Sequence, residues 1–299
     1  MKKALITGIT GQDGYLLKKI LEKKNYQILG LSRKKNKDEN ILKTNYSKNS
    51  IKKIIDFFKP DEIYHLAGFS NPKESWKYPE KNIFSNLKIT LNFLEILKKT
   101  KKIKFFNAST SEIFADSNGL LDENSKIHPM NPYGIGRSAS YFLVDAYRKK
   151  YNLFLINAIL FNHDSYKKKE TFLLKYLLTS CKKIISKKLK KITITDSRPI
   201  RDFGCAKDFT NYFHKLMQIK ESGDFIIATG KSFSVKQVVN VYKKKFNLPL
   251  NCFDFKDNLK FKNLFRIRRA NNNKLIKTLK LKSIKQLPEV VDTMIRDLK

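Results

Sequence analysis

A glycine-rich turn near the N-terminus constrains the fold of this chain more than any other feature. Residues 4–17 read ALITGITGQDGYLL, in which Gly8, Gly11 and Gly14 lie between an apolar segment and a helical pattern. In dinucleotide-binding units the first glycine permits a tight turn, the second lets the backbone approach a pyrophosphate, and the third lets the helix pack on the strand. The N–H groups that begin the helix then face the phosphates. The segment therefore predicts a dinucleotide site.

Strand-like segments alternate with helical patterns through the first half of the chain. The strand-like segments are 3–7, 27–31, 62–66, 104–108 and 154–160, and the helical patterns are 15–24, 50–58, 83–99 and 133–150. This alternation predicts an α/β fold, a Rossmann-type doubly wound parallel sheet. After residue 162 the pattern loosens into helices at 172–188 and 288–298 and short segments near 192–194 and 224–228. We predict a NAD(P)-binding domain at 1–162 and a smaller C-terminal substrate-binding lobe at 163–299, with some chain returning to the sheet.

Composition places the chain among enzyme-sized globular proteins. Its 299 residues are 41% hydrophobic, which suffices for a substantial core. No run of about 18 apolar residues is present, and the N-terminus enters the glycine motif without a signal-peptide pattern. Cys181, Cys205 and Cys252 are widely spaced and lack a histidine at ligand spacing. We therefore expect a cytoplasmic protein with no membrane association, no disulfide framework and no metal site.

The formal net charge of +35 has two interpretations. A strongly basic chain suits an anionic partner such as nucleic acid or a membrane surface. The lysines, however, are spread over nearly every predicted helix face and loop, which is typical of a base-composition bias acting on solvated positions. We favour the second interpretation and expect no nucleic-acid partner, although the positive field would favour a phosphate-bearing substrate.

Arg33, at the end of the second strand-like segment, bears on the choice of cofactor. NAD-preferring sites usually place an acidic residue there for the ribose hydroxyls, whereas an arginine suits the 2′-phosphate of NADP. We therefore predict NADP. The alternative is that Arg33 is one more solvated cation.

Three further segments carry candidate catalytic groups: 107–112 (NASTSE), 131–137 (NPYGIGR) and 159–165 (ILFNHDS). The first follows a strand, at the sheet edge where ligands bind in open α/β folds, so Thr110 and Glu112 can both face the cleft. Tyr133 and Arg137 are four residues apart and share one face of a helix. A cation beside the phenol favours tyrosinate, the form that acts as a base.

These segments, together with 66–70, 201–208 and 225–230, resemble the extended short-chain dehydrogenases/reductases and, among them, the GDP-mannose 4,6-dehydratase family. The resemblance runs from the N-terminus to about Val239, and from Leu248 onward it is loose. It implies a lyase in which bound NADP takes a hydride from sugar C4 and returns it to C6, with Tyr133 as base and Thr110 bonded to the same oxygen. Glu112 would remove the C5 proton as water leaves from C6. The implied substrate is GDP-mannose or a related GDP-hexose or GDP-heptose, and the product a 4-keto-6-deoxy sugar for surface polysaccharide.

The resemblance also implies which residues hold the ligands. The implied cofactor residues are Gly8, Ile9, Thr10, Gly11, Gln12, Asp13, Gly14, Arg33, Asn45, Tyr46, Leu66, Ala67, Gly68, Phe69, Ser70, Arg137, His163 and Lys168. The implied substrate residues are Asn162, Lys175 and Arg201, whose two cations suit a diphosphate.

The chain departs from the family pattern at several positions. Arg137 replaces a lysine, and guanidinium and ammonium groups differ in shape, so we expect weaker activation of Tyr133. Gly134 and Gly136 loosen the same turn, because glycine is about 1 kcal/mol worse than alanine inside a helix. Asn45 stands where relatives have an adenine-binding aspartate. In addition, Lys81 replaces an aromatic residue beside the cofactor, and the segment Arg266–Arg269 only loosely matches the arginine that grips the nucleotide.

The short loop after Arg33 lacks the arginine-rich extension that reaches a neighbouring subunit in relatives. We therefore expect a homodimer rather than a tetramer. Two alternatives to the dehydratase remain open: a 4-epimerase or 4-reductase on the same scaffold, against which Glu112 argues, and a degenerate member that binds nucleotide sugar without turnover, which Arg137 favours.

Overall fold

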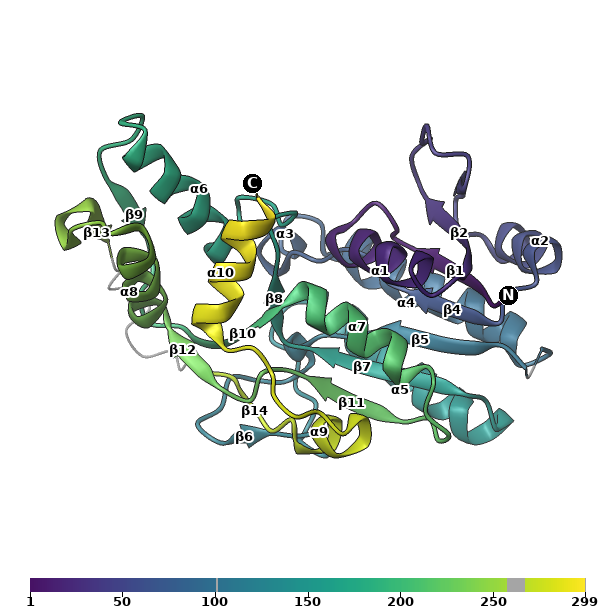
Figure 1. Ribbon diagram of the computed structural model, residues 1–299. Helices are drawn as coiled ribbons and strands as arrows, with labels where there is room; N and C mark the ends of the chain where they lie inside the picture. The colour runs from purple at the N-terminus through teal and green to yellow at the C-terminus, as the bar shows by residue number, and fades with distance from the viewer. Residues whose placement is uncertain (101, 257–266, 299) are drawn as a thin grey trace.

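The fold is an open parallel sheet with helices on both faces and a second group of elements at one end (Figure 1). The computed structural model describes residues 1–100, 102–256 and 267–298. Within them, seven strands form one sheet in the order β11-β7-β5-β4-β1-β2-β3, with every neighbouring pair parallel. They are β1 (Lys3–Thr7), β2 (Gln27–Ser32), β3 (Ile41–Lys43), β4 (Glu62–His65), β5 (Lys104–Ala108), β7 (Leu155–Leu160) and β11 (Asp224–Ile227). The predicted Rossmann-type class is confirmed.

Both faces of the sheet are covered because successive side chains along a strand point to opposite sides. Ala4 and Ile6 pack in one core with α1, α7 and α9, while Leu5 packs in another with α2, α4 and α5. These helices are α1 (Gln12–Glu22), α2 (Lys48–Phe58), α4 (Pro79–Leu97), α5 (Pro132–Tyr151), α7 (Ala206–Leu216) and α9 (Asn273–Leu279). The sheet edge at the strand C-termini is left for ligands.

A third core unites the second group of elements, seen at the left of Figure 1. There α6, α8 and α10 pack around Leu177, Val238 and Val291. The group comprises β8 (Asn162–Asp164), α6 (Leu173–Ile185), β9 (Ile192–Ile194), β10 (Ile200–Cys205), β12 (Ser232–Ser234), α8 (Val235–Phe246), β13 (Phe253–Phe255) and α10 (Leu287–Asp297). Shorter elements are α3 (Pro72–Ser75), η1 (Ser111–Ile113), β6 (Leu120–Leu121), η2 (Leu250–Cys252) and β14 (Arg269–Ala270).

The chain passes between the two groups several times. It enters the second group at β8, returns to the sheet with α7 and β11, leaves again with β12 and α8, and comes back with α9 before ending in α10. The division at residue 162 stays a prediction. Across residues 1–100, 102–256 and 267–298, no helix has both the length and the apolar character needed to cross a membrane.

Asp202 of β10 anchors the junction beyond β11. Its carboxylate is fully buried and accepts hydrogen bonds from Thr229 N (2.9 Å), Thr229 Oγ1 (2.9 Å) and Gly230 N (2.8 Å). Burial raises the pKa of Asp202 to about 7, against the opposing effect of those donors. This contact fixes the chain where it leaves the sheet for the second group.

Candidate active site

A cavity of about 250 Å³ opens where β4, β5 and β7 end beside the first turns of α5. All four residues predicted as catalytic line it: Thr110, Glu112, Tyr133 and Arg137. The C-terminal ends of parallel strands are where ligands bind in such sheets. The fold therefore gathers these side chains from separate segments into one site.

The glycine turn beside this cavity leaves room for a phosphate group. Gly8 has a φ of +69°, which favours glycine, and a Cβ at Gly14 would lie 2.4 Å from Gly8 O. Only a glycine lets α1 pack so closely on the turn. A Cβ at Gly11 would meet Gly8 O at 3.2 Å and no other described atom within 4 Å. Ile9 packs in the core and Thr10 is exposed, so the turn fits a dinucleotide pyrophosphate.

Asp13 and Gln12 contact the segment after β7 directly. Asp13 Oδ2 lies 2.9 Å from His163 Nε2, and Gln12 Oε1 accepts from Ser165 N (2.9 Å). Lys168 Nζ donates to His163 O (3.3 Å). Burial alone would raise the pKa of Asp13, but the charge and hydrogen bond of His163, with Lys168, outweigh it and hold that pKa below its ordinary value. The predicted cofactor residues Asp13 and His163 are thus partners of each other.

The segment after β4, predicted to line the nicotinamide, is fixed by two side chains. Thr7 Oγ1 accepts from Leu66 N (3.1 Å) and Ala67 N (2.9 Å). Asn86 Oδ1 accepts from Phe69 N (3.2 Å). The predicted residues of this segment are Leu66, Ala67, Gly68, Phe69 and Ser70, of which Leu66 and Ser70 line the cavity.

Arg33 is exposed and sits over an aromatic ring of that segment. Its guanidinium carbon lies 5.3 Å from the centre of the Phe69 ring, and Lys81 Nζ lies 5.8 Å from the same centre. Two cations therefore flank one ring at the mouth of the predicted cofactor site. This charge would suit an additional phosphate.

Tyr46, one of the predicted cofactor residues, has a buried side chain. Its side chain is 3% exposed, packs in the core with α2 and α4, and donates from its hydroxyl to Leu31 O (3.1 Å). Its hydroxyl thus supports the end of β2 beside the glycine turn, and a contact between Tyr46 and the cofactor stays a prediction. Asn45 is exposed, and its Oδ1 accepts from the N–H of Ser47 (2.9 Å), the residue that caps α2.

Arg137 donates hydrogen bonds to the last residue of β5 and to the segment that follows β4. It is 4% exposed, donates from Nη1 to Ala108 O (2.9 Å) and from Nη2 to Phe69 O (3.5 Å), and its guanidinium carbon lies 5.6 Å from the Tyr133 ring centre. Within the described residues, its buried Nε and the nearby Ser109 Oγ have no hydrogen-bond partner. Unmet donors at this depth fit a polar ligand in the cavity.

Gly134 and Gly136 are sites of close packing rather than of a loosened turn. A Cβ at Gly134 would lie 2.3 Å from Glu112 O, and one at Gly136 would lie 2.9 Å from Ile83 Cα. The helix α5 is continuous through both. These glycines bring its first turns against the site and against α4, which corrects our interpretation of them.

Glu112 is held on both carboxylate oxygens. Asn131 Nδ2 donates to Oε2 (2.7 Å), and Arg268, which is 4% exposed, forms an ion pair with Oε1. Arg268 Nε also lies 2.8 Å from Asp116 Oδ1, and Arg201 Nη2 lies 3.2 Å from the same oxygen. Two carboxylates and two guanidinium groups thus form one network beside the cavity.

This network places residues that the sequence left unassigned. Arg268 meets the predicted base Glu112, while Arg269 is exposed and Arg266 lies outside the described residues. Arg201 reaches the site through Asp116, which was not predicted. A buried arginine beside an acidic loop has no local sequence signal, because the two segments are far apart in the chain.

The other predicted substrate residues lie near the second group of elements. Asn162 lines the cavity together with Lys168. Lys175, in the first turn of α6, is not among the lining residues, and burial lowers its pKa. Its neighbour Leu173 does line the cavity, so this end of α6 borders the site.

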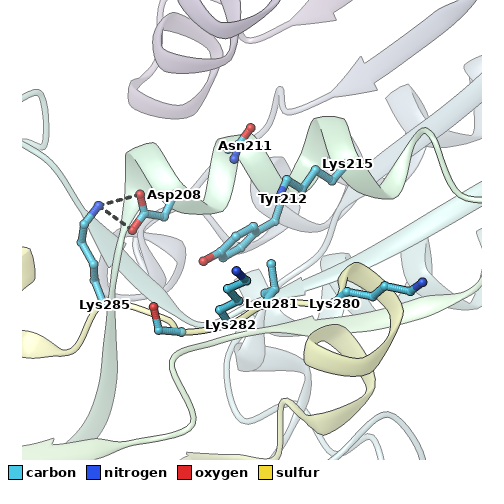
Figure 2. Close-up of a pocket in the computed structure, with 9 residues that line it drawn as sticks. Asp208, Asn211, Tyr212, Lys215, Lys280, Leu281, Lys282 and Lys285 are labelled. Carbon is cyan, nitrogen blue, oxygen red and sulfur yellow. Dashed lines mark hydrogen bonds and ion pairs between the residues drawn. The ribbon is translucent and has the colours of Figure 1, made fainter.

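A second cavity, of about 370 Å³, lies between α7 and the segment after α9 (Figure 2). Its wall carries several lysines, and Lys285 Nζ lies 2.9 Å from both oxygens of Asp208. None of the predicted site residues lines it. Within the described part of the chain, no cluster of His, Cys, Asp and Glu suited to a metal is found.

The strand order, the glycine turn and the tyrosine one helical turn before a buried cation define the class of extended short-chain dehydrogenases/reductases. Residues 5–260 match the family model described as GDP-mannose 4,6 dehydratase, and the chain belongs to that family. It is 32% identical over 265 residues to GDP-mannose 4,6 dehydratase 2 of Caenorhabditis elegans, covering 80% of this chain and 69% of that protein. It is 34% identical over 260 residues to the Homo sapiens GDP-mannose 4,6 dehydratase, covering 79% and 70%.

Solved structures share the fold at lower identity. RMD of Pseudomonas aeruginosa, complexed with NADPH, superposes with a TM-score of 0.85 at 18% identity, covering 100% of this chain and 99% of that one. The dTDP-glucose 4,6-dehydratase of Bacillus anthracis, in complex with NAD, has a TM-score of 0.85 at 16% identity, covering 99% and 96%. At these identities the likeness concerns the fold.

Proposed function

We propose that this protein is a lyase, an NADP-dependent nucleotide-sugar 4,6-dehydratase that acts on GDP-mannose or a closely related GDP-sugar. One observation carries the proposal: Thr110, Glu112 and Tyr133 line a single cavity beside the glycine turn. Membership of the GDP-mannose 4,6-dehydratase family supports the substrate class. The RMD complex with NADPH and the exposed Arg33 at the cofactor mouth support NADP.

Each catalytic side chain has a distinct part. Tyr133 takes the proton of the sugar C4 hydroxyl, and Thr110 donates a hydrogen bond to the same oxygen. The resulting C4 ketone makes the C5 proton acidic, so that Glu112 can remove it while hydroxide leaves C6 and takes from Tyr133 the proton that came from the C4 hydroxyl, forming water. Glu112 then returns its proton to C5 as C6 receives the hydride. NADP, when bound, supplies the acceptor and then the donor of a hydride, so the cofactor shows no net oxidation.

The binding residues divide between the two groups of elements. The turn from Gly8 to Gly14 would hold the cofactor pyrophosphate, and Arg33 the 2′-phosphate. The predicted substrate residues Asn162, Lys175 and Arg201 would hold the nucleotide sugar, with the two cations at its diphosphate. Assembly as a homodimer and a cytoplasmic location stay predictions.

The alternatives predict different products. A 4-epimerase or 4-reductase needs no base for C5, and the firmly held Glu112 favours the dehydratase. A binding-only protein is favoured by Arg137, whose guanidinium is engaged with two backbone carbonyls. It would bind NADP and GDP-mannose without forming a product.

Incubation of the protein with GDP-mannose and NADP tests the proposal. We expect a 4-keto product lighter than the substrate by one water, without net formation of NADPH, as read by mass spectrometry and absorbance. Glu112→Gln should abolish dehydration, whereas the matched control Glu221→Gln, at an exposed glutamate far from the cavity, should not. Binding of both ligands with no product in any form of the protein would favour the binding-only alternative.

A further inference from the structure

Asn131 contacts two parts of the candidate active site with one side chain. It precedes α5 in an extended conformation (φ −153°, ψ 160°) and is 8% exposed. Its Oδ1 accepts from Gly134 N (2.9 Å), which caps the helix that carries Tyr133. Its Nδ2 donates to Glu112 Oε2 (2.7 Å). One amide therefore joins the predicted C5 base to the helix of the predicted C4 base.

The two ends of this amide cannot exchange places. The N–H of Gly134 requires an acceptor, so the oxygen of Asn131 must face the helix and the nitrogen must face Glu112. The absence of a Cβ at Gly134 reinforces the geometry, because any side chain there would overlap Glu112 O. The N–H of Gly134 at the start of α5 therefore determines that Glu112 faces the amide nitrogen of Asn131.

The opposite oxygen of Glu112 faces Arg268, which Asp116 also contacts. Both carboxylate oxygens therefore face N–H groups, and an ionised carboxylate accepts at both. A base must be ionised before it removes a proton. Asn131 and Arg268 together suit the form of Glu112 that the dehydration step needs.

We propose that Asn131 is a positioning residue that fixes Glu112 relative to Tyr133 and presents it as a carboxylate. This inference rests on the proposed function, because it assigns Asn131 to the C5 proton transfer of that reaction. Asn131 touches no reacting atom and acts through Glu112. Its removal should slow dehydration more than oxidation at C4.

Asn131→Ser separates the two contacts. Serine caps helices about as well as asparagine, but its side chain cannot reach Glu112 with an amide N–H. We expect kcat to fall by about 100-fold, the effect of misplacing a catalytic group by about 1 Å, with little change in KM or Tm. Reduced nicotinamide should accumulate after GDP-mannose is added, because C4 oxidation proceeds while C5 deprotonation lags.

Two further variants control for folding. Ser234→Ala removes the cap of α8, no residue of which lines the cavity, and should lower Tm without accumulation of reduced cofactor. Asn131→Asp keeps a cap oxygen but sets a second carboxylate against Glu112, and should be slower than Asn131→Ser. Wild-type turnover in Asn131→Ser would overturn the proposal, as would equal loss of both half-reactions with a lowered Tm.

A failure of the proposed function is distinguishable from a failure of this inference. If the wild-type protein neither reduces NADP nor forms product with GDP-mannose, the proposed function fails. The position of Glu112 in a crystal structure of Asn131→Ser then decides the inference. A displaced carboxylate supports the positioning role, and an unchanged one overturns it.

Discussion

The imidazole of His163 and the carboxylate of Asp13 lie 2.9 Å apart, although 150 residues separate them in the chain. The second ring nitrogen of His163 is engaged as well, at 2.7 Å from Phe161 O. The contact joins the first turn of α1, which follows Gly8 and Gly11 of the glycine turn, to β8, the first strand of the second group. The predicted cofactor turn and the second group of elements are therefore joined to one another by this contact.

Replacement of His163 by alanine should destabilise the protein. We expect the free energy of unfolding to fall by about 1–3 kcal/mol, because Asp13 loses its partner in a mostly buried position. Denaturant unfolding measures the change. His128→Ala, at an exposed histidine, is the control and should have little effect. Equal stability of the two variants would contradict a role for the His163–Asp13 contact.

Replacement of Arg137 by lysine should raise turnover several-fold. The guanidinium is tied to Ala108 O and Phe69 O, whereas a compact ammonium is free to approach the Tyr133 phenol. The lost hydrogen bonds should lower the free energy of unfolding by about 1 kcal/mol. Steady-state kinetics with GDP-mannose tests this, with Arg148→Lys on the same helix as control. Unchanged or lower turnover would show that Arg137 does not weaken the activation of Tyr133.

Replacement of Arg33 by glutamine should weaken NADP binding by about tenfold or more, because a hydrogen bond to a charged group is worth about 1.5–3 kcal/mol. NAD, which lacks the 2′-phosphate, should bind almost unchanged. Isothermal titration calorimetry with both cofactors measures the difference, and the exposed Lys37→Gln is the matched control. Equal losses of NADP affinity in Arg33→Gln and Lys37→Gln would show that Arg33 is a solvated cation with no specific contact to the 2′-phosphate.

His65 should make the stability depend on pH. It is fully buried between Thr7 Oγ1 (2.9 Å) and Thr90 Oγ1 (3.2 Å), and burial, followed by the charge of Arg137, lowers its pKa to about 3 from 6.5. Between those two pH values the unfolded chain binds a proton at His65 and the folded chain does not. The contribution of neutral His65 to the free energy of unfolding is therefore complete above pH 6.5. It is lost as the pH falls toward the folded pKa, at about 1.4 kcal/mol per pH unit.

Comparison with His65→Gln isolates this effect. Asp202, whose raised pKa of about 7 acts with the opposite sign, is common to both proteins and cancels in the difference. Urea unfolding between neutral pH and pH 4 should show a steeper loss for the wild-type chain. Parallel stability curves would mean that His65 does not titrate differently in the folded and unfolded states.

The sheet was predictable because its strands are short apolar runs bounded by helical periodicity. The helix α7 was not predicted, although Phe209, Phe213 and Leu216 recur at helical spacing on its buried face. Thr110 and Glu112 could be placed at the ligand-binding edge because they follow a strand of the parallel sheet, whereas Tyr133 was joined to them only by the resemblance to the family. The sequence could not show that Tyr46 lies in the core, since that depends on a contact between its hydroxyl and Leu31 O.

The network around Glu112 lay beyond sequence reasoning for a different reason. Arg268 is one of several basic residues in a row, and nothing local distinguishes it from Arg269, which is exposed. Its burial follows from the parallel pairing of β14 with β6, two strands about 150 residues apart that bring position 268 beside the acidic loop. The pairing of two distant strands, rather than local composition, therefore determines which arginine is buried beside Glu112.

The repeated crossing of the chain between the sheet and the second group limits how this protein can change over evolution. A gene fusion that joins the front half of one relative to the back half of another would replace β11 and α7 along with the second group of elements. Every such exchange therefore disturbs the large sheet and one of the helices that cover it. New sugar specificity is more accessible through single substitutions and loop replacements than through the trading of halves.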